Sequence, residues 1–296
     1  MARPFRFGVN MVTPAGGTEW RRRCRRAEDL GYDVLLVADH LGMPAPFPAV
    51  LAAAAATRRP RVGTFVLNAA FWTPALLARE IATTDALTDG RLEVGLGTGY
   101  VRSEHEQAEV EWRSPGGRVD HLRRTVEELE RLLADEEHLP RPAQHPGPPL
   151  LLGGNGDRML RLTAEHADIA AFTGARTGAG AADGALELLT ADQLEERVAV
   201  YHRMATGRRT PAELNLHIQS VIVTDDRRAA VRDKVPAFPY LTEDQVLGLP
   251  VFLIGTVGQM ADQLREQRER YGFSYITVLD PCMEAFGPVI EELAGS

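Results

Sequence analysis

Apolar residues recur along the chain in short runs, and these runs alternate with longer amphipathic stretches. A nearly continuous apolar run such as Val34–Ala38 is typical of a parallel strand that is buried on both faces. The same reading predicts eight strands, at Phe5–Asn10, Val34–Ala38, Arg61–Asn68, Arg91–Leu96, Leu150–Leu152, Ile169–Phe172, Leu214–Val223 and Tyr275–Leu279.

The stretches between these strands carry helix signals. Thr18 suits the N-cap of a helix that runs to Leu30, and Gly31 suits the C′ position after it. Thr190 with Gln193, and Thr256 with Gln259, have the spacing of capping boxes, which open helices. The remaining predicted helices are Phe47–Thr57, Pro74–Leu87, Arg118–Leu133 and Arg158–Ala167, and the helix opened by Thr256 runs to Tyr271.

Strands that alternate with helices form a parallel sheet with right-handed crossovers, either an open doubly wound sheet or a barrel. Eight units in 296 residues favour the α/β class with a (β/α)8 TIM barrel. An open dinucleotide fold would place GxGxxG after the first strand, and Gly8–Thr13 does not contain it. We predict one barrel domain over residues 1–296, with loop insertions at Thr173–Leu189 and Lys234–Pro250.

Composition narrows the class of protein. The chain is 44% hydrophobic and 25% charged, as in ordinary globular proteins, and its net charge of −8 argues against nucleic-acid binding. Cys24 and Cys282 form no CxxC pair, which fits a reducing compartment. Met1–Asn10 lacks the apolar core of a signal peptide, and the longest apolar run, Ala49–Ala56, is too short for a bilayer. We therefore predict a cytoplasmic protein with a small-molecule partner and no membrane partner.

In such barrels the chemistry lies at the carboxyl ends of the strands. Asp39 and His40 directly follow the second predicted strand. Histidine can give or take a proton near neutral pH, and the carboxylate could orient it or accept a hydrogen bond from a bound ring. The alternative is that Asp39 and His40 only cap a helix or pack in the core. Their position directly after a buried strand favours a functional role.

Two glycine-rich segments also follow strands. Gly97-Thr98-Gly99 is either a tight turn or a surface on which a planar ring lies close to the backbone. Gly153-Gly154-Asn155-Gly156 leads into a predicted helix, where free N–H groups and the helix dipole favour a phosphate. The alternative for this second segment is a flexible turn.

Several familiar catalytic motifs are absent from the sequence. No HxH ends the first strand, and there is no GxSxG or Walker loop. The histidines His105, His121, His138, His145 and His166 lack metal-ligand spacing and are interpreted as solvated or packing residues. No metal site is expected.

Taken together, these segments resemble the bacterial luciferase-like monooxygenase superfamily, and within it the oxidoreductases that depend on the deazaflavin coenzyme F420. The matching segments cover nearly the whole chain: Ala27–Asp33, Ala38–Leu41, Arg61–Thr64, Pro74 with Ala78–Glu80, Leu87–Arg91, Gly95–Tyr100, Gly153–Gly156 and Phe252–Thr256.

The resemblance implies a luciferase-like barrel, often a homodimer, that binds coenzyme F420 or FMN across its mouth. It implies that Asp39 contacts the ring and that His40 helps proton transfer. It places a cis-peptide bulge that backs the ring near Phe65-Val66, and it also implies cofactor contacts from further strand ends, namely Asn68, Gly97, Thr98, Gly99, Gly153, Gly154, Asn155, Gly156, Thr173 and Gly174.

One position departs from the resemblance. Deazaflavin-dependent sugar-phosphate dehydrogenases place a glutamate just after GTG, and Tyr100 stands there in this chain, as a candidate proton donor. Lys234 is the only lysine, so a sugar-phosphate substrate is not expected. The leading hypothesis is an F420-dependent oxidoreductase that reduces a C=C or C=O group by hydride transfer. An FMN-dependent monooxygenase with a partner reductase and a non-catalytic flavin-binding barrel are the alternatives.

Overall fold

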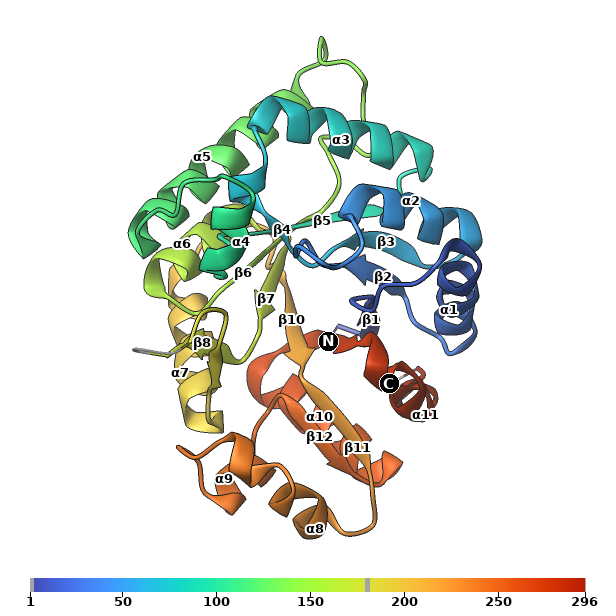
Figure 1. The fold of residues 1–296 in the computed structure, drawn as a ribbon, viewed down its shortest axis with the longest axis vertical. Coiled ribbons are helices and arrows are strands. Elements are labelled where there is room, and N and C mark those ends of the chain that lie inside the picture. The colour runs from blue at the N-terminus through green and yellow to red at the C-terminus, as the bar shows by residue number, and fades with distance from the viewer. Residues whose placement is uncertain (1–2, 179–181, 296) are drawn as a thin grey trace.

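The computed structural model describes residues 3–178 and 182–295, and in these residues eight parallel strands close into a barrel surrounded by helices (Figure 1). The barrel strands are β1 (Arg6–Asn10), β2 (Val34–Val37), β3 (Arg61–Thr64) with its extension β4 (Leu67–Asn68), β5 (Leu92–Gly97), β6 (Leu150–Gly153), β7 (Ile169–Phe172), β10 (Glu213–Ile218) and β13 (Phe273–Leu279).

Each barrel strand is followed by a helix on the outside of the barrel. These helices are α1 (Gly17–Asp29), α2 (Pro46–Ala56), α3 (Pro74–Leu87), α5 (Pro115–Ala134), α6 (Asp157–His166), α7 (Ala191–Met204), α10 (Val257–Tyr271) and α11 (Met283–Leu293). None of the helices in the described residues is both long and apolar enough to cross a membrane.

The pairing of the strands decides between the open doubly wound sheet and the barrel, which the sequence left as alternatives. β1 pairs with both β2 and β13, and β3 pairs with β5, so the parallel ladder returns to its start. The predicted (β/α)8 barrel is therefore confirmed, and the open doubly wound sheet is excluded. Gly31 at C′ of α1 and the capping boxes at Thr190 and Thr256 are confirmed as well.

Several predicted boundaries are wrong, and the helix predicted at Arg118–Leu133 begins three residues earlier, at Pro115. Helix α1 begins at Gly17 with Gly16 as its N-cap, so Thr18 lies inside the first turn. The third strand is not continuous over Arg61–Asn68, because it breaks at the cis peptide Phe65-Val66 between β3 and β4. The seventh predicted strand, Leu214–Val223, breaks at Gln219, after which the chain leaves the barrel.

The segments predicted as loops contain short elements, and the second excursion is longer than the predicted Lys234–Pro250, because it runs from Ser220 to Gly255. β8 (Ala175–Thr177) and β9 (Leu186–Leu188) form an antiparallel hairpin after β7. After β10 the chain forms β11 (Ser220–Val223), α8 (Arg227–Arg232), α9 (Glu243–Leu247) and β12 (Phe252–Gly255), where β11 and β12 make a separate two-stranded sheet. Other short elements are α4 (Arg102–Gln107) and the 3₁₀ turns η1 (Ala69–Phe71), η2 (Val235–Ala237) and η3 (Asp280–Cys282).

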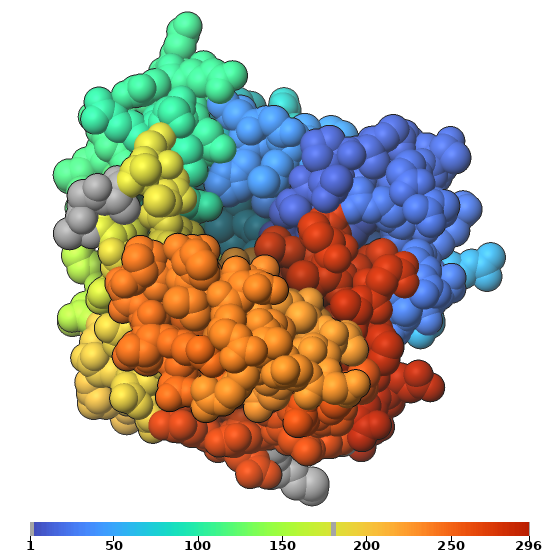
Figure 2. Space-filling model, turned by 60° about the horizontal axis from the view of Figure 1, so that its bottom comes forward, coloured from blue at the N-terminus to red at the C-terminus, as the bar shows by residue number. Residues whose placement is uncertain are grey.

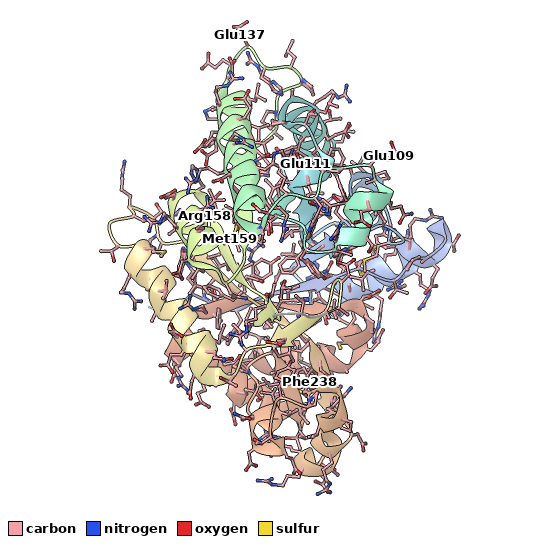
Figure 3. The ribbon with its side chains drawn as sticks, turned by 60° about the vertical axis from the view of Figure 1, so that its left-hand side comes forward. Glu109, Glu111, Glu137, Arg158, Met159 and Phe238 are labelled. Carbon is pink, nitrogen blue, oxygen red and sulfur yellow. The ribbon has the colours of Figure 1, made fainter. Side chains whose placement is uncertain are left out.

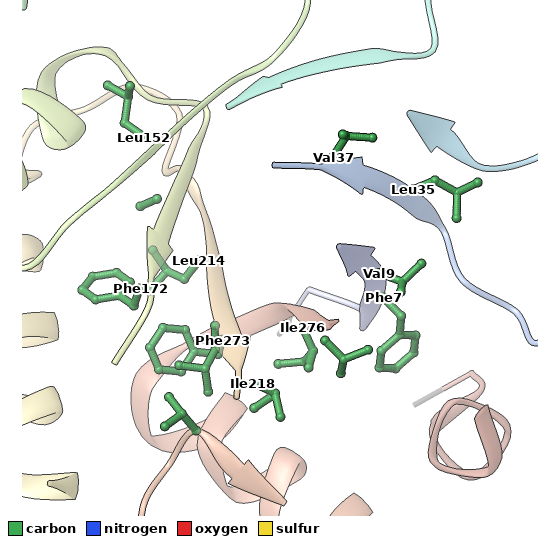
Figure 4. Close-up of a cluster of buried hydrophobic side chains, with 14 of the residues drawn as sticks. Phe7, Val9, Leu35, Val37, Leu152, Phe172, Leu214, Ile218, Phe273 and Ile276 are labelled. Atoms are coloured by element: carbon green, nitrogen blue, oxygen red, sulfur yellow. The ribbon is translucent and has the colours of Figure 1, made fainter. Parts of the chain in front are cut away.

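The main core lies between the barrel and its helices. Alternate residues of each strand point outward, as Phe7 and Val9 on β1 and Leu35 and Val37 on β2 do (Figure 4). These side chains are at most 4% exposed, and burying each contributes about 1.5–3 kcal/mol. The outer surface of the barrel is thus held by a continuous apolar layer.

The inside of the barrel is more polar than its outside. On β1 the inward positions are Arg6, Gly8 and Asn10, and at the amino-terminal end Arg6 forms ion pairs with Glu93 and Glu213. The Arg6 guanidinium also lies 4.0 Å from the centre of the Tyr275 ring. This buried charged cluster fills the end of the barrel opposite the carboxyl ends of the strands.

The inner face of β5 carries a row of glycines that accommodates the third strand. A Cβ at Gly95 would lie 2.2 Å from the backbone oxygen of Thr64, and a Cβ at Gly97 would lie 2.7 Å from Cγ2 of Val66. The third strand therefore packs directly onto the β5 backbone, and a side chain at either glycine would push the two strands apart.

Gly97→Ala should consequently destabilise the fold, by about 1–3 kcal/mol, because overpacked sites cost free energy. Gly258→Ala is the matched control: nothing lies within 4 Å of a Cβ in this first turn of α10, so the same change should stabilise by up to about 1 kcal/mol. Urea unfolding of both variants measures the difference. Equal stability of the two variants would contradict the proposed close contact.

Candidate active site

The carboxyl ends of the barrel strands open into a hollow on the molecular surface. Figure 2 shows this hollow between the yellow β8–β9 hairpin, the orange segment that contains α9, and the blue and green segments after the first strands. The residues predicted to be functional follow β2, the third strand, β5, β6 and β7, so they all belong to this end. We refer to it as the mouth.

Asp39 is held by two residues from the segment that follows the cis peptide of the third strand. Its Oδ2 accepts hydrogen bonds from the backbone N–H of Asn68 at 3.1 Å and from Nε1 of Trp72 at 3.2 Å. Burial raises the pKa of Asp39, whereas these two hydrogen bonds favour the carboxylate. Of the two roles expected for Asp39, orienting the His40 imidazole is wrong, because another carboxylate contacts that ring.

That carboxylate belongs to Glu104. Nδ1 of His40 lies 2.9 Å from Oε1 of Glu104, and the His40 ring stands edge-on to Tyr100 with the ring centres 5.6 Å apart. A carboxylate accepts hydrogen bonds, so Nδ1 carries the proton and Nε2 is the nitrogen left for other groups. Burial, together with the charge of Glu104, raises the pKa of Tyr100 and keeps it a neutral phenol.

Helix α4, which carries Glu104, is anchored from both sides. Both carboxylate oxygens of Asp183, in the β8–β9 hairpin, accept hydrogen bonds from the backbone N–H groups of Arg102 and Ser103, at 2.7 and 2.8 Å. The next residue, His105, is fully buried, and its ring packs against Trp112 with the centres 4.8 Å apart. These contacts fix the turn that brings Glu104 to His40.

The cis peptide Phe65-Val66 confirms the predicted position of the bulge. Phe65 is buried at the top of the barrel, where its backbone oxygen accepts a hydrogen bond from Asn10 Nδ2 at 3.3 Å. Its ring contacts the imidazole of His217, with the ring centres 5.1 Å apart. Val66 turns toward Gly97, as described above.

The Gly97-Thr98-Gly99 segment completes this side of the mouth. Gly99 has a φ of +66°, and a Cβ there would lie 2.5 Å from Oδ1 of Asn68. Asn68 in turn caps η1, since its Oδ1 accepts from the N–H of Ala70 at 3.1 Å. Thr98 lies half-buried between the two glycines. The glycines are therefore required by protein contacts, independently of any bound ring.

The second glycine-rich segment, Gly153–Gly156, leads into α6 as predicted. Gly156 is the N-cap of α6 and no side chain caps the helix, so its first-turn N–H groups remain open to other acceptors. Asn155 donates from Nδ2 to the carbonyl of Ala175, while its buried Oδ1 has no partner. Figure 3 shows Arg158 and Met159 beside this loop, at the start of the helix.

Thr173 and Gly174 lie next to that loop. The hydroxyl of Thr173 donates to the carbonyl of Ala175 at 3.3 Å, which is the same carbonyl that Asn155 contacts. Gly174 has a φ of +60°, and a Cβ there would meet Val251 at 2.3 Å. The structure thus brings the predicted residues together as two groups, one around His40 and Asp39 and one around Asn155.

Sequence reasoning missed three residues of the mouth: Glu104, Trp72 and His217. Glu104 follows the GTG segment on a short helix, so a carboxylate soon after that turn was the available signal. On β10 the polar residues Glu213, Asn215 and His217 alternate with apolar ones, and this period of two indicates a polar barrel interior. Trp72 carries no comparable signal.

In the described residues, no group of three or more histidine, cysteine, aspartate or glutamate side chains could hold a metal ion.

The model of the luciferase-like monooxygenase family matches residues 1–274 of this chain. Among curated relatives, the F420-dependent glucose-6-phosphate dehydrogenase of Kribbella flavida is 37% identical over 120 residues, which are 38% of this chain and 36% of that protein. The 5,10-methylenetetrahydromethanopterin reductase of Archaeoglobus fulgidus is 27% identical over 175 residues, 55% of this chain and 52% of that protein.

A flavin-dependent relative is similarly distant. The oxygenase component of the trigonelline monooxygenase of Acinetobacter baylyi is 30% identical over 146 residues, 43% of this chain and 40% of that protein. The chain thus spans between 36% and 52% of the length of these curated relatives.

Solved structures of low sequence identity share the fold. The coenzyme F420-dependent tetrahydromethanopterin reductase of Methanopyrus kandleri has a TM-score of 0.76 at 15% identity, with 98% of this chain and 100% of that chain covered. The monooxygenase RslO1 of Streptomyces bottropensis has a TM-score of 0.74 at 20% identity, covering 97% of this chain and 99% of that one.

His217 makes the stability of the fold depend on pH. Burial lowers its pKa from 6.5 to about 4, so between these values the unfolded chain binds a proton that the folded chain does not. The stability is fully present above pH 6.5 and is lost as the pH falls toward 4, by up to about 3 kcal/mol.

His217→Gln removes this titration, so its free energy of unfolding should fall less steeply than that of the wild type across the same pH window. Urea unfolding at several pH values measures both slopes. Parallel curves for the two proteins would contradict the assignment of a depressed pKa to His217.

Proposed function

Since the chain belongs to the luciferase-like monooxygenase family, we propose that it is an oxidoreductase that binds coenzyme F420 in the mouth and acts there on a small organic substrate. The observation that carries the proposal is the pair of His40 and Glu104 beside Asp39, at the carboxyl end of β2. A histidine oriented by a carboxylate and open to the mouth is suited to proton transfer.

The residues around the mouth fit such a cofactor. Asp39, Asn68 and the Phe65-Val66 bulge would line the ring on one side, and Gly97, Thr98 and Gly99 would border it. At the other group, the N-terminus of α6 would hold a phosphate of the tail, and the unpartnered Asn155 Oδ1 nearby would accept a hydrogen bond from a donor group of the ligand instead of binding the phosphate. Thr173 and Gly174 would line the same part of the site.

The protein's own contribution is to position and to move a proton. A bound deazaflavin supplies the hydride chemistry, while the barrel fixes the substrate against it. His40, with Nδ1 bonded to Glu104, would give or take a proton through Nε2. Tyr100, a neutral phenol edge-on to His40, is a second proton donor for the same place. Reduction of a C=C or C=O group is the expected direction.

The runner-up is an FMN-dependent monooxygenase that works with a partner reductase. Its support is the similarity to the flavin-dependent oxygenase component of Acinetobacter baylyi, which is comparable to the similarity to the F420-dependent relatives. A flavin-binding barrel without turnover is disfavoured, because it would have no use for the hydrogen-bonded pair of His40 and Glu104.

Fluorescence titration of the purified protein with F420 and with FMN decides the cofactor, and we expect tighter binding of F420. Submicromolar binding of FMN with no binding of F420 would overturn this choice in favour of the monooxygenase. Binding of neither cofactor would overturn the proposed function as a whole.

The same titration locates the phosphate when it is repeated on two variants of Gly156. Nothing lies within 4 Å of a Cβ there, so Gly156→Asp and Gly156→Asn both fit as N-caps of α6. Only the aspartate adds a negative charge, and it should weaken cofactor binding by about 10- to 100-fold relative to the asparagine. Gly154 is less suitable, because its φ is +149° and Met159 lies 3.2 Å from its Cβ position.

His40→Ala should lower single-turnover rates by about 10²- to 10⁴-fold while cofactor affinity changes little, because the imidazole serves the transition state. Glu104→Gln should lower the rate by roughly 10-fold or more, since the charge that supports the imidazolium is lost. Glu106→Gln, on the same helix but exposed and paired with Arg102, is the control and should react normally. Normal rates in His40→Ala would remove His40 from the mechanism.

A further inference from the structure

The top of the barrel interior is a layer formed by four strands that alternate around the ring. The last inward-facing residues at the mouth are Asn10 on β1, Phe65 after β3, Gly153 on β6 and His217 on β10. Phe65 contacts both residues, through its backbone oxygen with Asn10 and through its ring with His217, so the three lie in one layer. Gly153 adds no side chain, so the layer is open on that side.

Among the residues that the structure describes, two buried acceptors in this layer have no partner, and Asn215 Oδ1, one layer deeper in the barrel, has none either. Asn10 is 4% exposed, and while its Nδ2 donates to Phe65, its Oδ1 is without a hydrogen bond. His217 is 7% exposed, and its Nδ1 is also without one. An unpaired buried polar atom costs free energy, and both residues contact Phe65 in the layer beneath the mouth, so together they point to a ligand.

The protonation state of His217 makes its free nitrogen an acceptor. Burial lowers its pKa to about 4, so the imidazole is neutral at neutral pH. The backbone of Thr277, which pairs with His217 across the neighbouring strands, partly offsets this lowering of the pKa. A neutral imidazole has one donor and one acceptor nitrogen, so Nδ1, which has no partner, accepts a hydrogen bond in the tautomer that carries its proton on Nε2.

The two acceptors border the proposed cofactor residues only through Phe65 and Gly153 of their own layer. The cofactor residues follow β2, the third strand, β5, β6 and β7, whereas Asn10 and His217 belong to β1 and β10 on the remaining part of the ring. That part of the mouth is the space left for the substrate. The charged side chains of the barrel interior, such as Arg6 and Glu213, lie at the opposite end.

We propose that Asn10 and His217 form a specificity floor that accepts a hydrogen bond from an uncharged O–H or N–H group of the substrate. The inference rests on the proposed function in treating the bound molecule as a substrate. The hydrogen bond itself requires only that an organic molecule binds in the mouth. A charged group is disfavoured, because this buried layer offers two neutral acceptors and no counter-ion. The substrate class is therefore a neutral organic molecule that carries a donor, such as a hydroxyl or an amide N–H, in addition to the C=C or C=O group that is reduced.

The test uses cyclohexanol and its methyl ether, which differ in the donor, as probes in ligand-observed NMR. The wild type should bind the alcohol about 3- to 10-fold more tightly than the ether, as expected for one neutral hydrogen bond. Asn10→Leu, His217→Phe or both should lose this preference. In the same variants the affinity for F420 should stay within about 3-fold of the wild type.

Asn215→Leu is the matched control. Asn215 is buried on the same strand, two residues before His217, and its Nδ2 donates to Tyr275 and Thr277 within the barrel. Its loss should lower the melting temperature but leave the preference for the alcohol intact. His217→Gln restores an acceptor and should retain part of the preference, which covers the case that the phenylalanine variant does not fold.

The outcomes separate this inference from the proposed function. Equal binding of alcohol and ether by the wild type, or a preference that survives in both floor variants, overturns the floor even if F420 binds. A preference lost equally in Asn215→Leu overturns it too, because the effect would then be structural. Failure of both F420 and FMN to bind overturns the proposed function. The alcohol and the ether still test the hydrogen bond to Asn10 and His217 in that case, because they are measured on the protein without cofactor.

Discussion

The inner face of β5 must stay free of side chains, because the backbone of the third strand lies directly on it. At Gly95 the nearest atom is a backbone oxygen, which cannot move aside as a flexible side chain could. This contact brings Asn68 over Gly99, where the Asn68 backbone holds Asp39. The glycines that look like a ring-binding motif therefore first build the mouth, and only then can the mouth bind a ligand.

Polar groups are segregated inside a barrel whose outer surface is apolar. One end is filled by the cluster of Arg6 with Glu93 and Glu213, where several partners share the cost of burying charge. The other end holds the uncharged side chains of Asn10 and His217, together with the hydrogen-bonded pair of His40 and Glu104 at the rim. This difference makes one end a charged, packed part of the core and the other the place where a ligand can bind.

Much of the fold could be predicted because its signals are local. Apolar runs located the eight barrel strands, and Gly31 and the capping boxes marked helix ends. The break at Gln219 could not be seen, because the apolar pattern continues through Ile222 while the strand changes partners from β13 to β12. The position of His40 directly after a strand also identified it as a candidate site residue. Its partner Glu104 is 64 residues away in the sequence, and only the fold brings the two together. The homodimer and the cytoplasmic location stay predictions.

Hydrogen–deuterium exchange with and without saturating F420 tests most directly whether the mouth is the binding site. The account predicts slower exchange in residues 65–72, 97–104 and 153–157, because these backbone segments surround the proposed ring and phosphate positions. Protection confined to another surface, such as the groove between α1 and α11 lined by Leu30, Gly31 and Ile290, would contradict it. So would unchanged exchange in all three segments while the cofactor is bound.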